Sequence, residues 1–423
     1  MMRSPTTFFF LLLFFFLASP LNAAVTIEIR GGAGQGIPLA VLPFSGESPG
    51  QNSIAEIAAS DLARSGLFRI VPAGAPPPTT LEGALPRDFL SLKAQGVVLG
   101  RLTATPQELR IAFRLLDPVA NKALLGLEIF GAPSAKRRLG HRVADLIYEA
   151  MTGKKGPFSA LMAYVTRRGG QYALRLADSD GWPQDILLSS SEPILSPVFS
   201  PRGDEIAYVS FESKRPVIYL QHLASGSRRA LTQAYGQASA PAFSPSGAEI
   251  AFALLENGES HIHTLSRGGG GLAQLTSGAG LDTEPCYSPD GRFIYFTSDR
   301  GGSPQIYRLD TASRAVKRIT FSGAYNTSPA VTPDGRSLIF VHRDGGGEGI
   351  AVLDLASGQM RTISPSGGAE SPSVSPDGRM VVYSAQGWGR GSLRLATIDG
   401  RVEANLEPSS ADIRDPAWGP LPP

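Results

Sequence analysis

The 423-residue chain has little cysteine, little charge and few long apolar runs. Its single cysteine, Cys286, cannot form an internal disulfide, so packing has to stabilise the fold, as a chain of this length allows. Charged residues make up 18% of the chain and the net charge is +2, which argues against a nucleic-acid-binding or polybasic membrane-binding surface. No stretch after Ala18 is apolar for long enough to span a bilayer.

The first 23 residues have the features of a secretory signal peptide. Arg3 precedes the apolar run Phe8–Ala18, which is shorter than the ~20 residues that a spanning helix needs. Small residues follow this run. We expect cleavage after Ala23, with Ala24 as the alternative, and export of the mature chain.

A short motif recurs through the second half of the chain. Ser196–Gly203 reads Ser-Pro-Val-Phe-Ser-Pro-Arg-Gly, and near copies begin at Ala240, Glu284, Ser328 and Ser371. The first prolines of the copies, with that of a last, truncated one, are at 197, 241, 285, 329, 372 and 416, a period of 44 with one step of 43. A period of about 40–45 residues indicates one β-propeller blade per repeat.

Each copy predicts a first strand, a hairpin turn and a second strand. Proline is tolerated at the first residue of a strand, because that residue's N–H need not join the ladder. The Pro-Asp-Gly segment then favours a tight turn. The second strands are apolar and rich in β-branched or aromatic residues, as strands typically are: Glu205–Ser210, Glu249–Ala253, Phe293–Ser298, Ser337–His342 and Met380–Ser384.

The incomplete copies predict how the ring closes. Three strand-like runs, Ala160–Arg167, Tyr172–Ala177 and Asp185–Ser189, have no proline-led first strand before them. Conversely, Asp415–Pro420 is a first strand with no blade after it. We therefore predict a six-bladed β-propeller over residues 157–423 that is closed by the C-terminal strand and has no free edge.

Residues 24–156 lack the repeat and predict a separate small α/β domain, so the fold class is this domain followed by the propeller. The pattern predicts helices over Ser53–Ser65, Pro86–Ala94 and Ser134–Met151, the last capped by Ser134. The predicted strands are Val25–Arg30, Ile37–Phe44, Phe68–Val71, Gly96–Leu102, Leu109–Leu116 and Ala123–Phe130.

The motifs that could carry chemistry have simpler interpretations. Gly46–Gly50 matches a Gly-x-Ser-x-Gly nucleophile elbow, but Pro49 lacks the N–H that an oxyanion hole needs after the serine. Asp178–Gly181 resembles the start of a calcium loop, yet it falls where the first blade needs a turn. His261-x-His263 has no implied third ligand. We expect a protein that is not an enzyme and has neither a metal nor a cofactor.

The residues that precede the repeated prolines form six loops in this prediction, and all six open on one mouth of the ring. They vary from blade to blade, whereas the hairpin turns at the other mouth do not. Variable loops on a rigid repeat scaffold are typical of binding sites. The loops are Ile194–Ser196, Gln237–Ala240, Leu281–Glu284, Tyr325–Ser328, Gly368–Ser371 and Asp412–Asp415.

With its repeats, signal peptide and N-terminal domain, the sequence resembles the TolB family, the periplasmic propeller proteins of the Tol-Pal system in Gram-negative bacteria. The resemblance covers essentially all of the mature chain. It is most specific over Phe199–Pro201, Ile206–Ser213, Thr283–Pro285 and Phe296–Tyr307.

The resemblance implies a monomeric, non-enzymatic periplasmic adaptor that supports outer-membrane integrity and invagination during cell division. It implies two partners, the outer-membrane lipoprotein Pal at the propeller mouth and TolA at the N-terminal segment, with no nucleic acid and no membrane span. The implied TolA segment is Ala24, Val25, Thr26, Ile27, Glu28, Ile29 and Arg30. The implied Pal-facing residues are Gln237, Ala240, Asp282, Thr283, Glu284, Tyr325, Asn326, Thr327 and Glu370. Gln237 departs from the histidine of some relatives, which changes any contact made there.

Two other functions compete with this one. A propeller-containing serine peptidase would need an α/β-hydrolase domain, for which the chain has no room. A periplasmic ligand-binding receptor would need aromatic clusters at the mouth, where the predicted loops offer mainly Tyr325.

Overall fold

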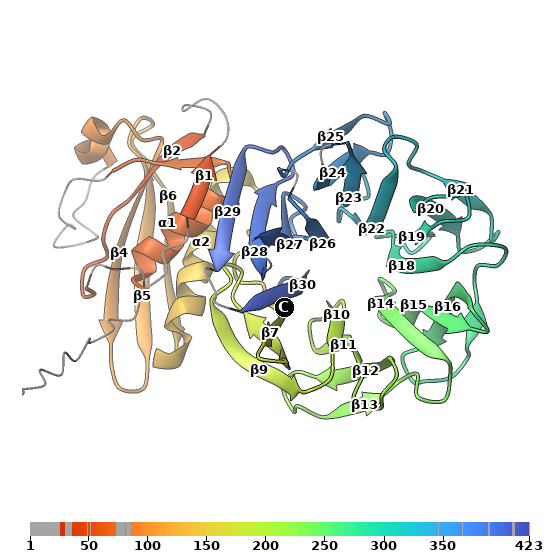
Figure 1. Cartoon of the computed structure of the whole chain (residues 1–423). Coiled ribbons are helices and arrows are strands. Elements are labelled where there is room, and N and C mark those ends of the chain that lie inside the picture. Colours follow the sequence, from red (N-terminus) through yellow and green to blue (C-terminus); the bar gives the residue numbers. More distant parts are fainter. Residues whose placement is uncertain are drawn as a thin grey trace, which may run out of the picture.

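The computed structural model describes residues 26–29, 36–48, 50, 52–72, 81, 86–345, 347–365, 367–387, 390–407 and 411–422. The predicted signal peptide, Met1–Ala23, lies outside them. Within these residues, no helix combines the length and apolar character needed to cross a membrane. Figure 1 shows a ring of strands beside a mixed sheet, with two helices between them.

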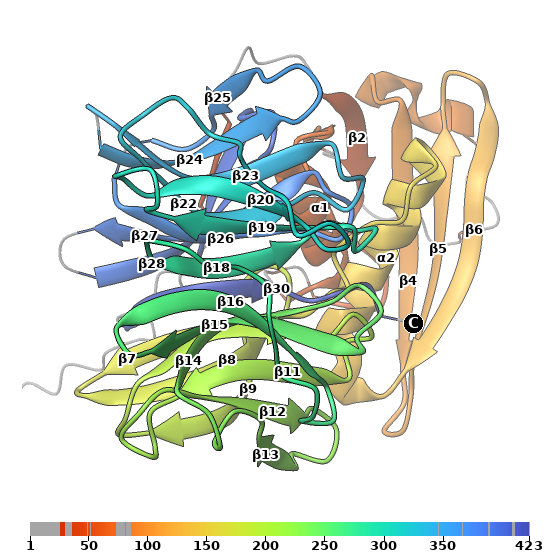
Figure 2. The same ribbon diagram turned by 90° about the vertical axis from the view of Figure 1, so that its right-hand side faces the viewer.

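The N-terminal part is a five-stranded sheet in the order β3-β2-β4-β5-β6. β2 is parallel to both β3 and β4, whereas β4, β5 and β6 are antiparallel neighbours. Helices α1 and α2 pack between this sheet and the ring, as both views show (Figures 1 and 2). The bounds are β2 Ile37–Val41, α1 Ile54–Arg64, β3 Phe68–Ile70, η1 Pro86–Leu92, β4 Gly96–Ala104, β5 Leu109–Asp117, β6 Lys122–Gly131, η2 Pro133–Ala135 and α2 Lys136–Thr152.

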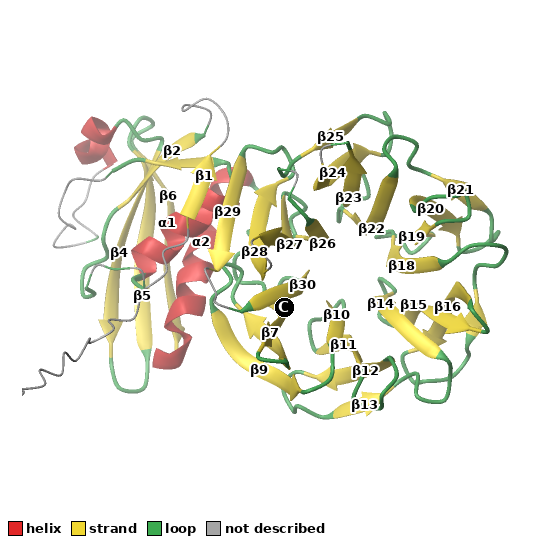
Figure 3. Ribbon diagram, viewed as in Figure 1, coloured by secondary structure: helices red, strands yellow, loops and turns green. Residues whose placement is uncertain are grey.

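The helices confirm part of the sequence-based prediction. α1 has the expected Ser53 cap, whose hydroxyl accepts a hydrogen bond from Glu56 N, and it ends before Gly66, which has a φ of +70°. The predicted Ser134 cap of α2 is wrong, because Pro133 starts a short 3₁₀ turn that includes Ser134. The predicted Pro86–Ala94 helix is also a 3₁₀ helix, η1, coloured red with α1 and α2 in Figure 3.

The ring has six blades in the described residues, and each blade is an antiparallel sheet. Blade 1 contains β30, β7, β8 and β9, blades 2 to 5 contain β10–β13, β14–β17, β18–β21 and β22–β25, and blade 6 contains β26–β29. The inner strand of each blade comes first in these lists. The predicted period of about 44 residues is therefore the length of one blade.

The strand bounds follow the repeat closely. They are β7 Met162–Arg168, β8 Gln171–Ala177, β9 Pro183–Ser190, β10 Ile194–Phe199, β11 Glu205–Ser210, β12 Val217–His222, β13 Arg228–Ala230, β14 Gln237–Phe243, β15 Glu249–Glu256, β16 Glu259–Ser266, β17 Ala273–Gln274, β18 Asp282–Tyr287, β19 Phe293–Ser298, β20 Gln305–Asp310, β21 Val316–Arg318, β22 Tyr325–Val331, β23 Ser337–Asp344, β24 Gly347–Asp354, β25 Met360–Thr362, β26 Ala369–Val374, β27 Met380–Gly387, β28 Arg390–Thr397, β29 Val402–Glu407 and β30 Asp412–Trp418.

The C-terminal strand closes the ring as predicted. β30 pairs antiparallel with β7, with Ile413 opposite Thr166 and Trp418 opposite Met162. Ile413 and Trp418 belong to a hydrophobic cluster that also contains core residues of the N-terminal sheet and of blade 6. Because the two parts share this core, our domain boundary between residues 156 and 157 stays a prediction.

The repeated proline does not begin its strand, contrary to our expectation. In every blade the strand starts three or four residues earlier, and the pairing register shifts at the proline, as between Leu195 and Val198. The proline therefore occupies a β-bulge, where its missing N–H is not needed by the ladder. The six predicted mouth loops are thus mostly the first halves of the innermost strands.

Candidate functional site

The alternating strand directions place two kinds of connection on opposite mouths of the ring. Connections that lead into each inner strand share one mouth, which we call the entry mouth, with the turns between second and third strands. The Pro-Asp-Gly turns and the turns between third and fourth strands lie at the other mouth. The predicted Pal-facing residues all belong to the entry mouth.

A ring of bulge residues lines the central tunnel beneath the entry mouth. The residue before each repeated proline has a backbone φ of +49° to +54°, which is unusual for residues other than glycine. These residues border a cavity of about 770 Å³ that runs along the axis. They are Ser196, Ala240, Glu284, Ser328, Ser371 and Asp415.

Two carboxylates in this ring join neighbouring blades. Glu284 accepts hydrogen bonds from the Ser328 backbone N–H and hydroxyl, both at 2.8 Å. Asp415 accepts one from Ser196 N at 3.1 Å and one from the Ser371 hydroxyl at 2.9 Å. Both acidic side chains therefore hold the inner strands of adjacent blades in register.

Two of the predicted binding residues are fully buried. Asp282 is 0% exposed, and both of its carboxylate oxygens accept hydrogen bonds from Arg300 Nη2 at 2.8 Å. Asn326 is also 0% exposed, and its side chain contacts Gln305 and His342 at 2.8 and 2.7 Å. Their side chains support the entry mouth from within and do not face solvent.

The other predicted residues lie nearer to the surface, with one exception. Gln237 is exposed, whereas Thr283 and Glu370 are half-buried. Burial raises the pKa of Glu370. Half-buried Tyr325 lies under the guanidinium of Arg343, 4.5 Å from its ring centroid. The exception is Thr327, which is buried.

Two exposed apolar side chains at the entry mouth were not among the predicted binding residues, although Leu281 begins one of the predicted loops. Leu281 is 48% exposed and Phe321 is 73% exposed, and each lies in a connection that leads into an inner strand. Large apolar side chains in otherwise small and polar loops were the available signal. Together with Tyr325 they give this mouth the mixture of apolar and polar groups typical of protein interfaces.

The predicted TolA segment is described over Thr26–Ile29. These residues form β1, which pairs antiparallel with β29 and extends blade 6 to five strands. Thr26 lies opposite Asn405, and Ile29 lies opposite Val402. Ala24, Val25 and Arg30 lie outside the described residues, as do residues 31–35 of the glycine-rich stretch that follows.

The apparent nucleophile elbow has a structural role. Glu47, next to Ser48, accepts hydrogen bonds from Ile54 N at 2.9 and 3.1 Å and thereby caps α1. The carbonyl of Gly50 accepts a hydrogen bond from Ser53 N, so Glu47 and Gly50 both support the start of this helix. Cys286 is half-buried beside the central cavity, and desolvation raises the pKa of its thiol to about 11, which favours the protonated form.

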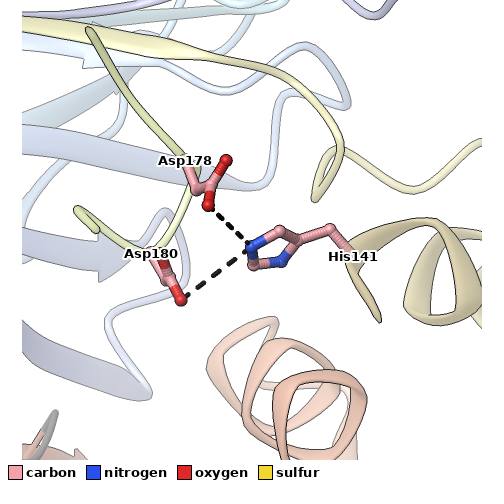
Figure 4. A group of neighbouring side chains, drawn as sticks. All are labelled: His141, Asp178 and Asp180. Carbon is pink, nitrogen blue, oxygen red and sulfur yellow. Dashed lines mark ion pairs between the residues drawn. The ribbon is translucent and has the colours of Figure 1, made fainter. Parts of the chain in front are cut away.

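A buried charged cluster lies between α2 and the turn that joins β8 to β9. Figure 4 shows His141 of α2 pointing towards Asp178 and Asp180, whose nearest oxygens lie 3.6 and 3.9 Å from its Nε2. The ligand atoms of these three residues lie within 4.8 Å of one another, as a metal would require. However, Arg137 already pairs with both carboxylates. The arrangement is therefore an ion-pair cluster.

The opposite ring nitrogen of His141 completes the cluster. Its Nδ1 lies 2.6 Å from Asp61 Oδ2, and Asp61 also pairs with the buried Arg64. Burial by itself lowers the pKa of His141, but the three carboxylates outweigh it and raise that pKa to about 10. With His141 protonated, three cations face three anions.

A second buried carboxylate lies one turn further along α2. Asp145 accepts hydrogen bonds from Phe158 N at 2.8 Å and Ser159 N at 3.0 Å, where the chain enters the propeller. Burial raises the pKa of Asp145 to about 7, although these two backbone bonds favour the charged form.

Because of this raised pKa, we expect the contribution of Asp145 to the stability of the protein to decrease as the pH rises. The folded protein keeps the proton up to about pH 7, whereas the unfolded chain loses it near 3.8. Between these values the free energy of unfolding falls with pH, by up to about 4 kcal/mol. Asp145→Asn should therefore gain stability relative to the wild type between about pH 4.5 and 7.5. Urea unfolding of both proteins at these two pH values measures the gain, and Glu149→Gln, at an exposed position of the same helix, is the control. A difference in the free energy of unfolding between Asp145→Asn and the wild type that is the same at both pH values would contradict this prediction.

Both parts of the chain match known protein families. Residues 25–124 match the family model of the TolB amino-terminal domain, and residues 148–422 match that of the TolB beta propeller domain. The Tol-Pal system protein TolB of Methylobacillus flagellatus is 55% identical over 406 residues, which cover 95% of this chain and 94% of that protein. The protein of the same name from Polaromonas naphthalenivorans is 58% identical over 94% of this chain and 93% of its own.

A solved structure agrees with these relatives. The crystal structure of TolB from Acinetobacter baumannii superposes with a TM-score of 0.86 at 37% identity, and the match covers 94% of this chain and all of that one. Family models, relatives and structure all extend over the N-terminal sheet and the six blades. The chain therefore belongs to the TolB family of Tol-Pal system proteins.

Proposed function

We propose that this chain is a non-enzymatic periplasmic adaptor that binds Pal at the entry mouth and TolA through its N-terminal segment. In this role it supports outer-membrane integrity and invagination during cell division. The observation that carries the proposal is the entry mouth itself, a rigid ring with variable, partly apolar side chains on a chain of the TolB family. Helix α2 contacts turns of the opposite mouth, so it does not cover the entry mouth.

We expect Thr283→Arg to weaken Pal binding about tenfold or more, because a long charged side chain in the middle of a packed interface must be desolvated. Thr283 is half-buried near the start of β18, so its replacement projects into the mouth. Titration of the purified protein with soluble Pal measures this.

The matched control is Ala312→Arg in the same blade. Ala312 is exposed in the turn between β20 and β21, at the opposite mouth. This variant should bind Pal as the wild type does. Equal affinities for both variants would contradict the assignment of the entry mouth, whereas enzymatic turnover by the purified chain would contradict the adaptor class.

For TolA, we propose that the N-terminal strand exchanges between two partners. Among the described strands, β1 has one neighbour, β29, and such an edge strand can pair with another protein instead. The glycine-rich residues Gly31–Gly36 would act as the hinge, and Pal binding would bias the choice.

Deletion of Ala24–Arg30 should therefore abolish capture by TolA and leave Pal binding intact. A pull-down with immobilised TolA compares the deleted and full-length mature chains. Equal capture of the two forms would exclude this segment as the TolA site, and loss of both partners would indicate misfolding of the deleted form.

A further inference from the structure

Four polar residues follow one face of α2. Arg137, His141, Asp145 and Tyr148 are spaced by four, four and three residues, so their side chains share one side of the helix. His141, Asp145 and Tyr148 are at most 3% exposed. Helix faces buried in a core are normally apolar, so this polar stripe needs specific partners.

The first half of the stripe binds blade 1. Arg137 pairs with Asp178 and Asp180 in the turn between β8 and β9, and its guanidinium lies 4.5 Å from the ring centroid of Trp182 in the same turn. His141 points at the same two carboxylates. Asp61 and Arg64 of α1 supply the remaining charges of the cluster.

The middle of the stripe binds the entrance to blade 1. Asp145 holds the N–H groups of Phe158 and Ser159, and the carbonyl of Phe158 accepts a hydrogen bond from the Ser179 hydroxyl at 2.7 Å. The backbone at Gly156 passes very close to Asp145, because a Cβ at Gly156 would lie 2.5 Å from Asp145 Oδ1. The entry segment is thus clamped between α2 and the turn between β8 and β9.

The end of the stripe binds blade 6. The Tyr148 hydroxyl donates to Asp377 Oδ2 at 3.0 Å. Asp377 belongs to the Pro-Asp-Gly turn between β26 and β27, and its other oxygen makes the usual turn bonds to Ser375 and Arg379. The equivalent Asp290 and Asp334 make the same turn bonds in blades 4 and 5.

Blades 1 and 6 are the two blades that meet where the ring closes. Their boundary is formed by β30, the C-terminal strand that completes blade 1. Unlike the other inner strands, β30 has no covalent turn to the second strand of its blade, β7, and it follows β29 of blade 6 in the chain. The closing seam therefore lies where β30 pairs with β7.

We propose that α2 is a staple across the closing seam of the propeller, with its polar stripe holding blades 1 and 6 together. The shared hydrophobic cluster around Trp418 brings the same elements into contact, but apolar contacts are not directional. The hydrogen bonds and ion pairs of the stripe fix which turns α2 meets, and through them they keep β30 seated against β7.

Hydrogen exchange of the full mature chain tests the staple. The variant Arg137→Gln/Tyr148→Phe removes the ion pairs of Arg137 to blade 1 and the Tyr148 hydrogen bond to blade 6. We expect amides of β30 and β7 to exchange about tenfold faster or more. Amides of β19 and β20, in blade 4, should keep their wild-type rates. The control is Arg138→Gln, which removes the same charge from an exposed position on the same helix.

Wild-type rates in β30 and β7 of the double variant would overturn the proposal. An equal acceleration in all six blades would overturn it too, because the stripe would then contribute only to overall stability. If the double variant does not fold, Tyr148→Phe alone removes a single oxygen. It should show the same pattern with a smaller acceleration, and unchanged seam exchange in that variant would again contradict the staple.

Discussion

Deletion of residues 411–423 is expected to abolish the cooperative folding of the propeller. β30 is the inner strand of blade 1, and it buries Ile413, Ala417 and Trp418, which are at most 8% exposed. Burial of each large apolar side chain contributes about 1.5–3 kcal/mol, and unpairing of β7 adds to the loss. The total approaches the whole stability of a typical domain, about 5–15 kcal/mol.

Thermal unfolding followed by circular dichroism measures this effect. A chain that ends at Pro420 keeps β30 and should melt like the wild type. A peptide of residues 411–420, added to the chain that lacks residues 411–423, should restore part of the cooperative unfolding transition, because no covalent turn joins β30 to β7. A sharp transition at the wild-type temperature in the shortened chain would contradict this account of closure.

Asp282→Ala is expected to lower the free energy of unfolding by about 3 kcal/mol, since breaking a buried ion pair leaves a charge without its partner. Asp282 is 0% exposed and pairs with Arg300, whose side chain is 20% exposed. His261 lies on the other side, with Nδ1 3.4 Å from the same carboxylate. Urea unfolding measures the loss.

The same substitution should weaken Pal binding, because Asp282 begins the strand that carries Thr283 and Glu284. Asp282→Asn keeps the shape of the side chain and one acceptor, so both losses should be smaller than with alanine. An alanine variant as stable as the wild type would show that the desolvation of this carboxylate cancels the stabilisation by its ion pair. Reduced stability with normal Pal affinity would separate Asp282 from the binding surface.

At the entry mouth, the sequence predicted where the residues lie in the fold but not whether their side chains are buried. The repeat placed Asp282, Thr283 and Asn326 at one end of the inner strands, and the structure confirms that location. Burial of Asp282 and Asn326 depends on Arg300 and His342, which belong to other strands or turns of their blades. A single sequence does not show which distant side chain satisfies a polar group.

The bulges have a similar explanation. The recurring proline indicated where each inner strand lies, but not that the residue before it adopts a left-handed conformation. Non-glycine residues seldom adopt that conformation, and the missing N–H of proline suggested a strand that starts at the proline. The structure shows instead that each inner strand continues through a bulge at the proline.

By itself, the sequence determined the number of blades, their turns and the closure by the C-terminal strand. Each of these follows from local chemistry that recurs every 44 residues, and closure follows from one missing and one surplus strand. Only the tertiary structure decided the partners of α2, of β1 and of the buried carboxylates. These contacts join residues far apart in the chain, such as Tyr148 and Asp377, whose proximity depends on how the whole ring packs against the N-terminal sheet.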